Sequence, residues 1–155
     1  KGKLEINNNT IISSKNSILE ALNGSEVILK SGVFYGILTV LGGKSSLKIE
    51  KNAKIISETS ATTITAYNKV DIEGGEVEQK GSGKAIQISN GLCNIYDNAK
   101  ISSNGEYTIY SAYINSVLNV ENSTIINNAS NGYAIYKYSG TINVKNANII
   151  GNVQY

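Results

Sequence analysis

Four carboxylates are crowded into the segment "DIEGGEVE", residues 71–78. Asp71 and Glu73 are two positions apart, and alternate residues of a β-strand point to the same side, so we expect both carboxylates to face solvent. Such oxygen atoms bind Ca²⁺, and paired carboxylates act as acid and base on glycosidic bonds. The alternative is a solvated surface on which lysines pair with the acids. We favour the surface interpretation, because lysine partners lie nearby, and we predict no metal site.

Cys93 is the only cysteine in the 155 residues, and a lone cysteine can serve as a nucleophile. A catalytic thiol needs a base, and the chain contains no histidine. Cys93 also takes the place of an aliphatic residue in the repeat described below. We therefore expect a small buried side chain without a catalytic role.

Six of the ten tyrosines occur in two short segments of the second half of the chain. They are Tyr107, Tyr110, Tyr113, Tyr133, Tyr136 and Tyr138. Exposed aromatic rings in a row can contact sugar rings or anchor a protein partner. Tyrosine is also a good strand former that covers solvent-facing sheets without any ligand. Both interpretations stay open, and these six residues are the candidate ligand-binding set.

These residues belong to a repeat that runs through the whole chain. A pair written apolar-x-apolar occurs seven times, and the first members lie 20 to 25 residues apart. The pairs are Leu4-x-Ile6, Val27-x-Leu29, Leu47-x-Ile49, Val70-x-Ile72, Cys93-x-Ile95, Leu118-x-Val120 and Ile142-x-Val144. Polar neighbours alternate with the pair members, and this period of two indicates strands with one buried face.

A turn position follows each pair after two or three residues. The seven positions are Asn8, Ser31, Asn52, Gly74, Asn98, Asn122 and Asn146. Asn and Gly tolerate the left-handed backbone region, so this line predicts a tight bend in each coil, and stacked Asn side chains could hydrogen-bond from coil to coil. Three residues further on comes an apolar residue that we expect to face the interior: Ile11, Phe34, Ile55, Val77, Ile101, Ile125 and Ile149.

A third strand is visible in the later copies, around Ile64, Ile86, Ile109 and Ile135. Three short strands in each repeat predict an all-β fold, a right-handed parallel β-helix of about seven coils, in a single domain over residues 1–155. Aligning the third strands of the last two complete coils stacks two tyrosine pairs, about 4.8 Å apart: Tyr107 on Tyr133 and Tyr110 on Tyr136. The first strands align Lys48 beside Asp71.

The segment "SSKNSILEALNGSE", residues 13–26, departs from the repeat. Its apolar residues have helical spacing, with Ser14 as a candidate N-cap and Gly24 beyond the C-terminus. We expect a short helix over residues 15–22; the alternative is an irregular third strand aligned through Ile18. Neither end of the chain has room for another cap, so we expect a segment of a longer protein or a subunit that stacks head to tail.

The Asn-x-x-Ile turns, the three-strand coils and the stretch "ILEALNGSEVILKSGVF" together resemble the pectate lyase-like right-handed β-helix superfamily, and within it the Asn-rich adhesive domains of bacterial surface proteins. The resemblance covers nearly the whole chain and implies the fold more than an activity. Enzymes of this type use Asp-bound Ca²⁺ with a basic residue, often Arg, or clustered Asp with His. Here Asp71 and Asp97 are the only aspartates, and Arg and His are absent. No catalytic residue carries over.

Composition narrows the remaining function classes. A net charge of +2 is too small a bias to indicate nucleic-acid binding, and no apolar run approaches the roughly 18 to 20 residues that span a bilayer. We therefore expect a non-enzymatic, extracellular bacterial cell-surface adhesin or structural module without a cofactor, which binds a glycan or a host or bacterial surface protein. The alternatives are a polysaccharide lyase or glycoside hydrolase on the same scaffold and a self-stacking filament subunit.

Overall fold

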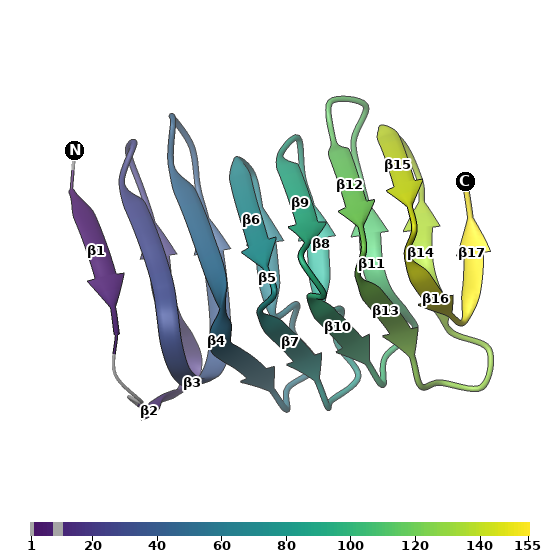
Figure 1. Ribbon diagram of the computed structural model, residues 1–155, viewed down its shortest axis with the longest axis horizontal. Coiled ribbons are helices and arrows are strands. Elements are labelled where there is room, and N and C mark those ends of the chain that lie inside the picture. The colour runs from purple at the N-terminus through teal and green to yellow at the C-terminus, as the bar shows by residue number, and fades with distance from the viewer. Residues whose placement is uncertain (1, 8–10) are drawn as a thin grey trace.

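The chain winds into a right-handed parallel β-helix, as the repeat predicts. The computed structural model describes residues 2–7 and 11–155, with only the backbone of residues 15–18. Within these residues every regular element is a β-strand, and strands of successive coils pair in parallel (Figure 1). The helix has about six turns and not the seven coils expected, because the seven first strands enclose six complete steps.

Each coil contributes one strand segment to each of three faces. The first face contains β1 (Lys3–Ile6), the start of β3 (Glu26–Val40), the start of β4 (Ser46–Ser57), β6 (Lys69–Glu73), β9 (Leu92–Tyr96), β12 (Val117–Glu121) and β15 (Thr141–Lys145). The second face contains the start of β2 (Ile11–Ala21), the middle of β3, the end of β4, β7 (Glu76–Gln79), β10 (Lys100–Ser103), β13 (Thr124–Asn127) and β16 (Asn148–Ile150). The third face contains the ends of β2 and β3, β5 (Ile64–Ala66), β8 (Ile86–Ile88), β11 (Tyr107–Ser111), β14 (Tyr133–Lys137) and β17 (Asn152–Gln154).

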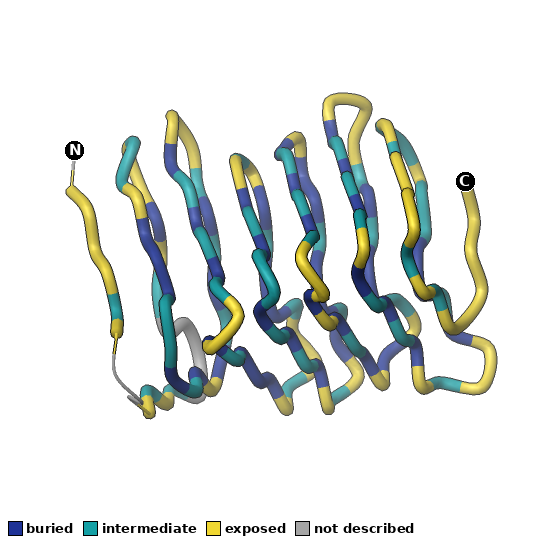
Figure 2. The backbone as a smooth tube through the Cα atoms, in the orientation of Figure 1, coloured by how far each residue is buried: buried dark blue, intermediate teal, exposed yellow. Residues whose placement is uncertain are grey.

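The apolar pairs of the repeat form inward ladders on the first face, as predicted, except that Leu4 in β1 and Val144 in β15 are 45% and 36% exposed. Val70 lies between Leu47 and Cys93 in the parallel register, and all three side chains are buried. Buried and partly exposed residues alternate along these strands (Figure 2). This alternation fixes the register, since a shift by one residue would turn the whole apolar set to solvent.

The interior of the third face is equally regular. Ile86 lies between Ile64 and Ile109 in the register, and Ile109 is followed by Ile135. All four are completely buried, which confirms the predicted third strand. Each side chain therefore contacts the same residue type one coil away, and stacked Ile residues pack closely on a pleated surface.

On the second face the structure corrects one core residue. Ile12, and not Ile11, pairs with Phe34 and packs against the core. Ile11 pairs with Val33 and is 72% exposed. Adjacent residues of a strand point to opposite sides, so only one of the two isoleucines can face inward. The sequence pattern fits either choice.

The helix expected over residues 15–22 is wrong. Residues 15–21 belong to β2, which pairs with β3 through two register shifts around Ser17. The alternative of an irregular third strand is therefore confirmed, but Leu19, and not Ile18, pairs with Leu38. Leu19 packs against the core and Ala21 is buried, whereas Leu22 is 42% exposed. The edge of β3 supplies backbone hydrogen bonds to the segment, and this pairing outweighs the helical spacing of its apolar residues. Among the described residues no helix is long and apolar enough to cross a membrane.

Buried polar side chains hold the turns between the second and third faces. Gln79, Ser103 and Asn127 occupy one inward position in successive coils and are at most 6% exposed. Asn127 Nδ2 donates to the carbonyl oxygens of Gly105 at 2.9 Å and Tyr133 at 3.1 Å. Its Oδ1 accepts a backbone N–H of the same turn at 2.9 Å. These bonds fix the point at which β14 begins.

Candidate binding site on the third face

Four tyrosine rings pack together on the outer side of β11 and β14. Tyr107 pairs with Tyr133 and Tyr110 with Tyr136, so the predicted alignment is confirmed. The ring centroids are 5.8 Å apart at 20° in the first pair and 5.5 Å apart at 6° in the second. Rings of different pairs meet edge to face, with 4.9 Å between Tyr107 and Tyr136. Contacts of this geometry stabilise aromatic rings, so each ring holds its neighbours in position.

The backbone below the rings is held by the interior. Ile109 and Ile135 point inward, so the residues that follow them, Tyr110 and Tyr136, point outward. Buried Thr108 adds a hydrogen bond from Oγ1 to the Ile126 carbonyl at 2.9 Å, which ties β11 to the second face. The tyrosine cluster therefore stands on a rigid strand pair and not on a loop.

Polar side chains continue the tyrosine rows in the neighbouring coils. Gln87 precedes Tyr110 in the register and Gln154 follows Tyr136. The ammonium of Lys84 lies 5.3 Å from the centroid of the Tyr110 ring, within the range of a cation–π interaction. Hydrogen-bonding groups thus border the aromatic surface at both ends along the axis of the helix.

The remaining two candidate tyrosines lie in the turns that follow the third face. Tyr113 is 53% exposed and Tyr138 is 72% exposed. They join the cluster to form a shallow hollow lined by Lys84, Gln87, Tyr107, Tyr110, Ala112, Tyr113 and Tyr138. The structure therefore brings all six predicted tyrosines to one side of the molecule.

Two phenol groups of the cluster, those of Tyr107 and Tyr110, have a raised pKa. A hydrogen bond with the Glu106 carboxylate is the main cause that raises the pKa of Tyr107 to about 12, with a smaller contribution from burial. Burial and then the neighbouring Tyr136 raise the pKa of Tyr110. The Tyr107 hydroxyl therefore donates to Glu106 and can accept from a ligand, whereas the Tyr110 hydroxyl can donate to one.

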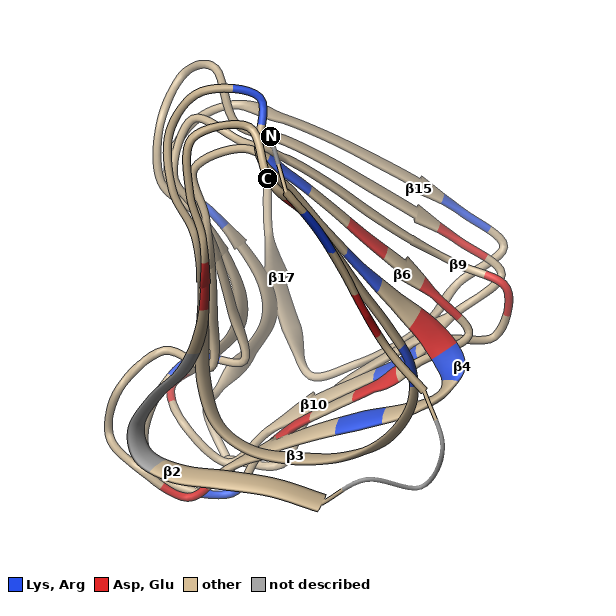
Figure 3. Cartoon of the chain, turned by 90° about the vertical axis from the view of Figure 1, so that its left-hand side faces the viewer, with Lys and Arg blue, Asp and Glu red and all other residues tan. Residues whose placement is uncertain are grey.

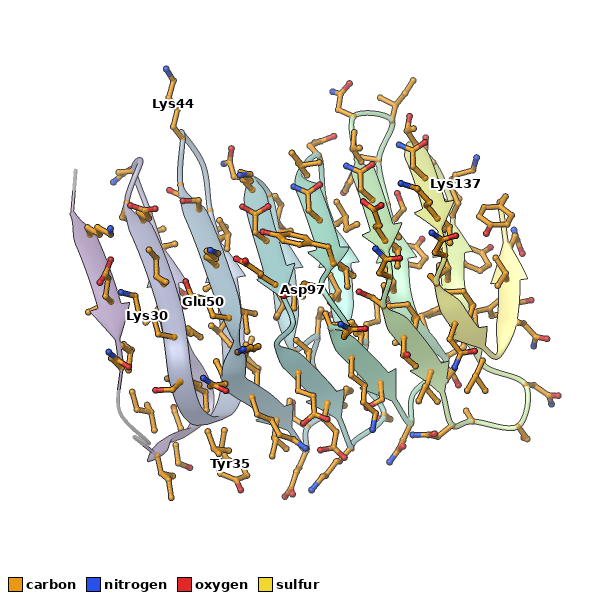
Figure 4. All side chains as sticks on the ribbon, in the orientation of Figure 1. Lys30, Tyr35, Lys44, Glu50, Asp97 and Lys137 are labelled. Atoms are coloured by element: carbon orange, nitrogen blue, oxygen red, sulfur yellow. The ribbon has the colours of Figure 1, made fainter. Side chains whose placement is uncertain are left out.

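Charge separates this face from the other two. Figure 3 shows lysines and acids interleaved on the first and second faces, whereas the third face is almost uncoloured. Figure 4 shows Lys30 and Glu50 on the first face, where both side chains point to solvent. A ligand on the third face meets mainly aromatic and amide groups.

The acidic cluster has partners within the protein. Lys48 lies beside Asp71 in the register, as predicted, but its ammonium pairs with Glu73. This hydrogen bond is the main cause that raises the pKa of Lys48. Asp71 accepts from Asn94 Nδ2 at 2.7 Å and pairs with Lys69 at 2.7 Å. The two candidate Ca²⁺ ligands are therefore engaged with separate partners, and across residues 2–7 and 11–155 no group of three acidic, Cys or His side chains is placed to hold a metal ion.

Cys93 is completely buried in the inward ladder of the first face. Burial is the main cause that raises the pKa of its thiol, and the Asp71 carboxylate adds to the effect. The reactive thiolate form is therefore strongly disfavoured. The position acts as a small apolar side chain.

The turn line is only partly uniform. Left-handed backbone occurs at Gly74, Asn98, Asn122 and Asn146, with φ of 70°, 63°, 48° and 51°. Ser31 and Asn52 lie within β3 and β4, and Asn8 is outside the described residues. In the described turns, neighbouring coils are joined through backbone groups, such as the Asn98 N–H donating to the Asn122 carbonyl at 2.8 Å.

Side-chain amides do stack on the first face, and also between Asn128 and Asn104 in the turns after the second face, where the distance is 3.0 Å. Asn143 Nδ2 donates to Asn119 Oδ1 at 2.8 Å, and Asn119 Nδ2 donates to Asn94 Oδ1 at 2.8 Å. The row ends where Asn94 donates to Asp71. In this amide ladder, which runs from Asp71 to Asn143, outward side chains of the first face hydrogen-bond to one another.

Lys84 and Gln87 were not among the candidate residues. The signal for Gln87 is present in the repeat, because aligning Ile86 with Ile109 places Gln87 next to Tyr110. Lys84 precedes β8 in a turn where spacing alone does not fix the register.

Comparison of the chain with models of known families, with curated proteins and with solved structures found no match.

Proposed function

We propose that this chain is a non-enzymatic β-helix module of the pectate lyase-like type, part of an extracellular bacterial adhesin, which binds a carbohydrate on its third face. The observation that carries the proposal is the cluster of four packed tyrosine rings, bordered by amide side chains in register. Sugars present apolar C–H faces next to hydroxyl groups. Aromatic rings beside a few placed hydrogen-bonding groups match that combination.

Order within the cluster supports binding. The rings contact one another at centroid distances of 4.9 to 5.8 Å, so their positions are set by the protein itself. A ligand therefore has little side-chain freedom to remove when it binds. The phenol hydroxyls and the Gln87 and Gln154 amides border this surface and supply directional bonds.

The other candidate chemistry supports a binding role. The Cys93 thiol is enclosed in the core, and Asp71 and Glu73 are paired with Lys69 and Lys48. A general acid or base needs access to a substrate within hydrogen-bond distance. These groups are instead occupied by neighbours.

The test is glycan binding by paired variants. A glycan array identifies a ligand, and calorimetry then compares the wild-type chain with the double variant Tyr110→Ala, Tyr136→Ala. We expect affinity to fall at least about tenfold, as for truncated aromatic anchors. The matched control is Tyr35→Ala, Tyr96→Ala, which removes two outward rings from the other faces; Figure 4 shows Tyr35 pointing away from the shaft.

Circular dichroism and thermal unfolding check that both double variants keep the fold. Equal loss of binding in the two variants, or full binding by the Tyr110→Ala, Tyr136→Ala chain, contradicts the proposal. Release of sugar fragments by the wild-type chain contradicts its non-enzymatic part.

A further inference from the structure

Most of the lysines whose side chains the structure describes are paired with carboxylates. Among the described residues seven have an acid oxygen within 4.0 Å: Lys3, Lys30, Lys48, Lys54, Lys69, Lys100 and Lys145. Lys54 is an example, with Glu76 at 3.0 Å and Glu78 at 2.9 Å. All seven belong to strands of the first and second faces or to the bend between them. An anion that approaches them meets a carboxylate as well as an ammonium.

Five other described lysines, Lys44, Lys51, Lys80, Lys84 and Lys137, have no such ion pair, and among them Lys84 is the one whose ammonium lies over an aromatic ring. No acid oxygen of the described residues lies within 4.0 Å of its ammonium, which is placed over the Tyr110 ring at 5.3 Å. Glu106, the residue directly before β11, is the nearby acid, and its carboxylate is hydrogen-bonded to the Tyr107 phenol. Lys84 is thus a cation without a carboxylate partner, held inside an aromatic hollow with Gln87 and Tyr113.

The surroundings of Lys84 strengthen the attraction between its ammonium and an anion. Aromatic rings displace water from part of the ammonium surface, and a charge pair is stronger where less water screens it. The Tyr110 hydroxyl and the Gln87 amide, which line the same hollow, can donate to the same anion. An anionic group that reached Lys84 would stand at the end of the Tyr110 and Tyr136 row, where a sugar ring lies in the proposed function.

We infer that the tyrosine site selects a carbohydrate that carries an anionic substituent, a carboxylate or a sulfate, and that Lys84 is the residue that determines this preference. The inference rests on the proposed carbohydrate binding. The sugar ring contacts the Tyr110 and Tyr136 pair, and the anionic group points along the axis toward β8. Lys137 also lies next to the cluster, between Tyr136 and Tyr138, but in the described part of the chain the cation over a ring is Lys84.

The experiment uses three glycans that share one backbone: neutral, sialylated and sulfated. Each is titrated into the wild-type chain, Lys84→Gln, Lys84→Arg and the control Lys80→Gln, which removes the same charge from an exposed turn. We expect the anionic forms to bind the wild type about tenfold more tightly than the neutral form, as for a charged hydrogen bond. Lys84→Gln should abolish that preference, so that the neutral and anionic forms bind this variant with equal affinity. Lys84→Arg and Lys80→Gln should retain it.

The two anionic probes separate the sources of negative charge, since tighter binding of either one supports the inference. Equal wild-type affinity for the neutral and both anionic glycans overturns it and leaves the proposed function intact. An equal loss in Lys80→Gln also overturns it, because the preference would then follow net charge. Failure of all three glycans to bind overturns the inference together with the proposed function.

Discussion

The first and third faces have the same kind of inward ladder but differ in how their outward side chains are used. On the first face the amide ladder and the ion pairs engage these side chains with one another, for example Asn119 with Asn94 and Lys48 with Glu73. On the third face the rings pack on one another beside an open hollow, and no carboxylate oxygen of the described residues lies within 4.0 Å of the Lys84 ammonium in that hollow. A single scaffold thus carries one face that is saturated internally and one that can accept a ligand.

The strongest test of the shared scaffold removes one rung of an inward ladder. Ile109→Ala deletes a completely buried side chain between Ile86 and Ile135. We expect a loss of about 2 to 5 kcal/mol in the free energy of unfolding, because the cavity cannot collapse between stacked coils. Ile72→Ala below the first face should cost a similar amount in urea unfolding. A much smaller loss at either site would show that the two interiors are not equivalent.

The support of the tyrosine face gives the next largest effect. Asn127→Ala leaves the Gly105 and Tyr133 carbonyl oxygens without their buried donor. Unsatisfied buried groups cost about 1 to 3 kcal/mol, and displacement of β14 should weaken glycan binding as well. Asn128→Ala is the control, because Asn128 is exposed and bonds only to exposed Asn104. Equal unfolding midpoints for the two variants would contradict the assigned role.

A smaller effect is expected from the amide ladder. Asn119→Ala breaks its bonds to Asn94 and Asn143, both of 2.8 Å. The loss should be about 1 kcal/mol, since each partly exposed bond contributes little net free energy. Glycan binding should be unchanged, because the ladder lies on the other face. Asn115→Ala, in an exposed turn, serves as the control in denaturant unfolding, and a binding defect in Asn119→Ala would break the separation of the two faces.

The smallest expected effects are changes in how stability depends on pH, and their sign differs between the first and third faces. The Lys3 and Lys30 ammonium groups hold the pKa of Glu5 on the first face at about 2, below its ordinary 4.5. Its stabilisation is therefore present above pH 4.5 and lost as the pH falls toward 2. Tyr107 on the third face has the opposite sense: its pKa rises from 10.0 to about 12, so its contribution is present below pH 10 and lost between pH 10 and 12.

Glu5 is exposed and Tyr107 is half-buried, so we expect melting-temperature differences of only a few degrees between wild type and variant. In a plot of melting temperature against pH, Glu5→Gln should flatten the acid side. Tyr107→Phe should flatten the alkaline side. A variant that altered the opposite limb would reverse the assignment.

The inward residues could be predicted because burial imposes a period of two on every strand. The register of Val70 on Leu47 and of Tyr110 on Tyr136 follows from that period alone. Outward partners could not be derived in the same way. Lys48 aligns with Asp71, yet its flexible side chain reaches diagonally to Glu73.

The errors occur where the apolar pattern is ambiguous. Adjacent Ile11 and Ile12 satisfy either register, and the segment of residues 15–22 has apolar spacing compatible with a helix until the edge of β3 is available to pair with it. Lys84 was missed for a related reason. It precedes β8 in a turn, and turns of variable length break the period that aligns one coil with the next.

The amide ladder also gives the molecule an electrical direction along its axis. Asp71 has only acceptor oxygens, so Asn94 must present Nδ2 to it, and Asn119 and Asn143 must then follow the same orientation. The three side-chain dipoles therefore align head to tail and polarise one another. Reversal of any single amide would set two oxygens or two nitrogens against each other. One carboxylate thus dictates the orientation of side chains three coils away, without contacting them.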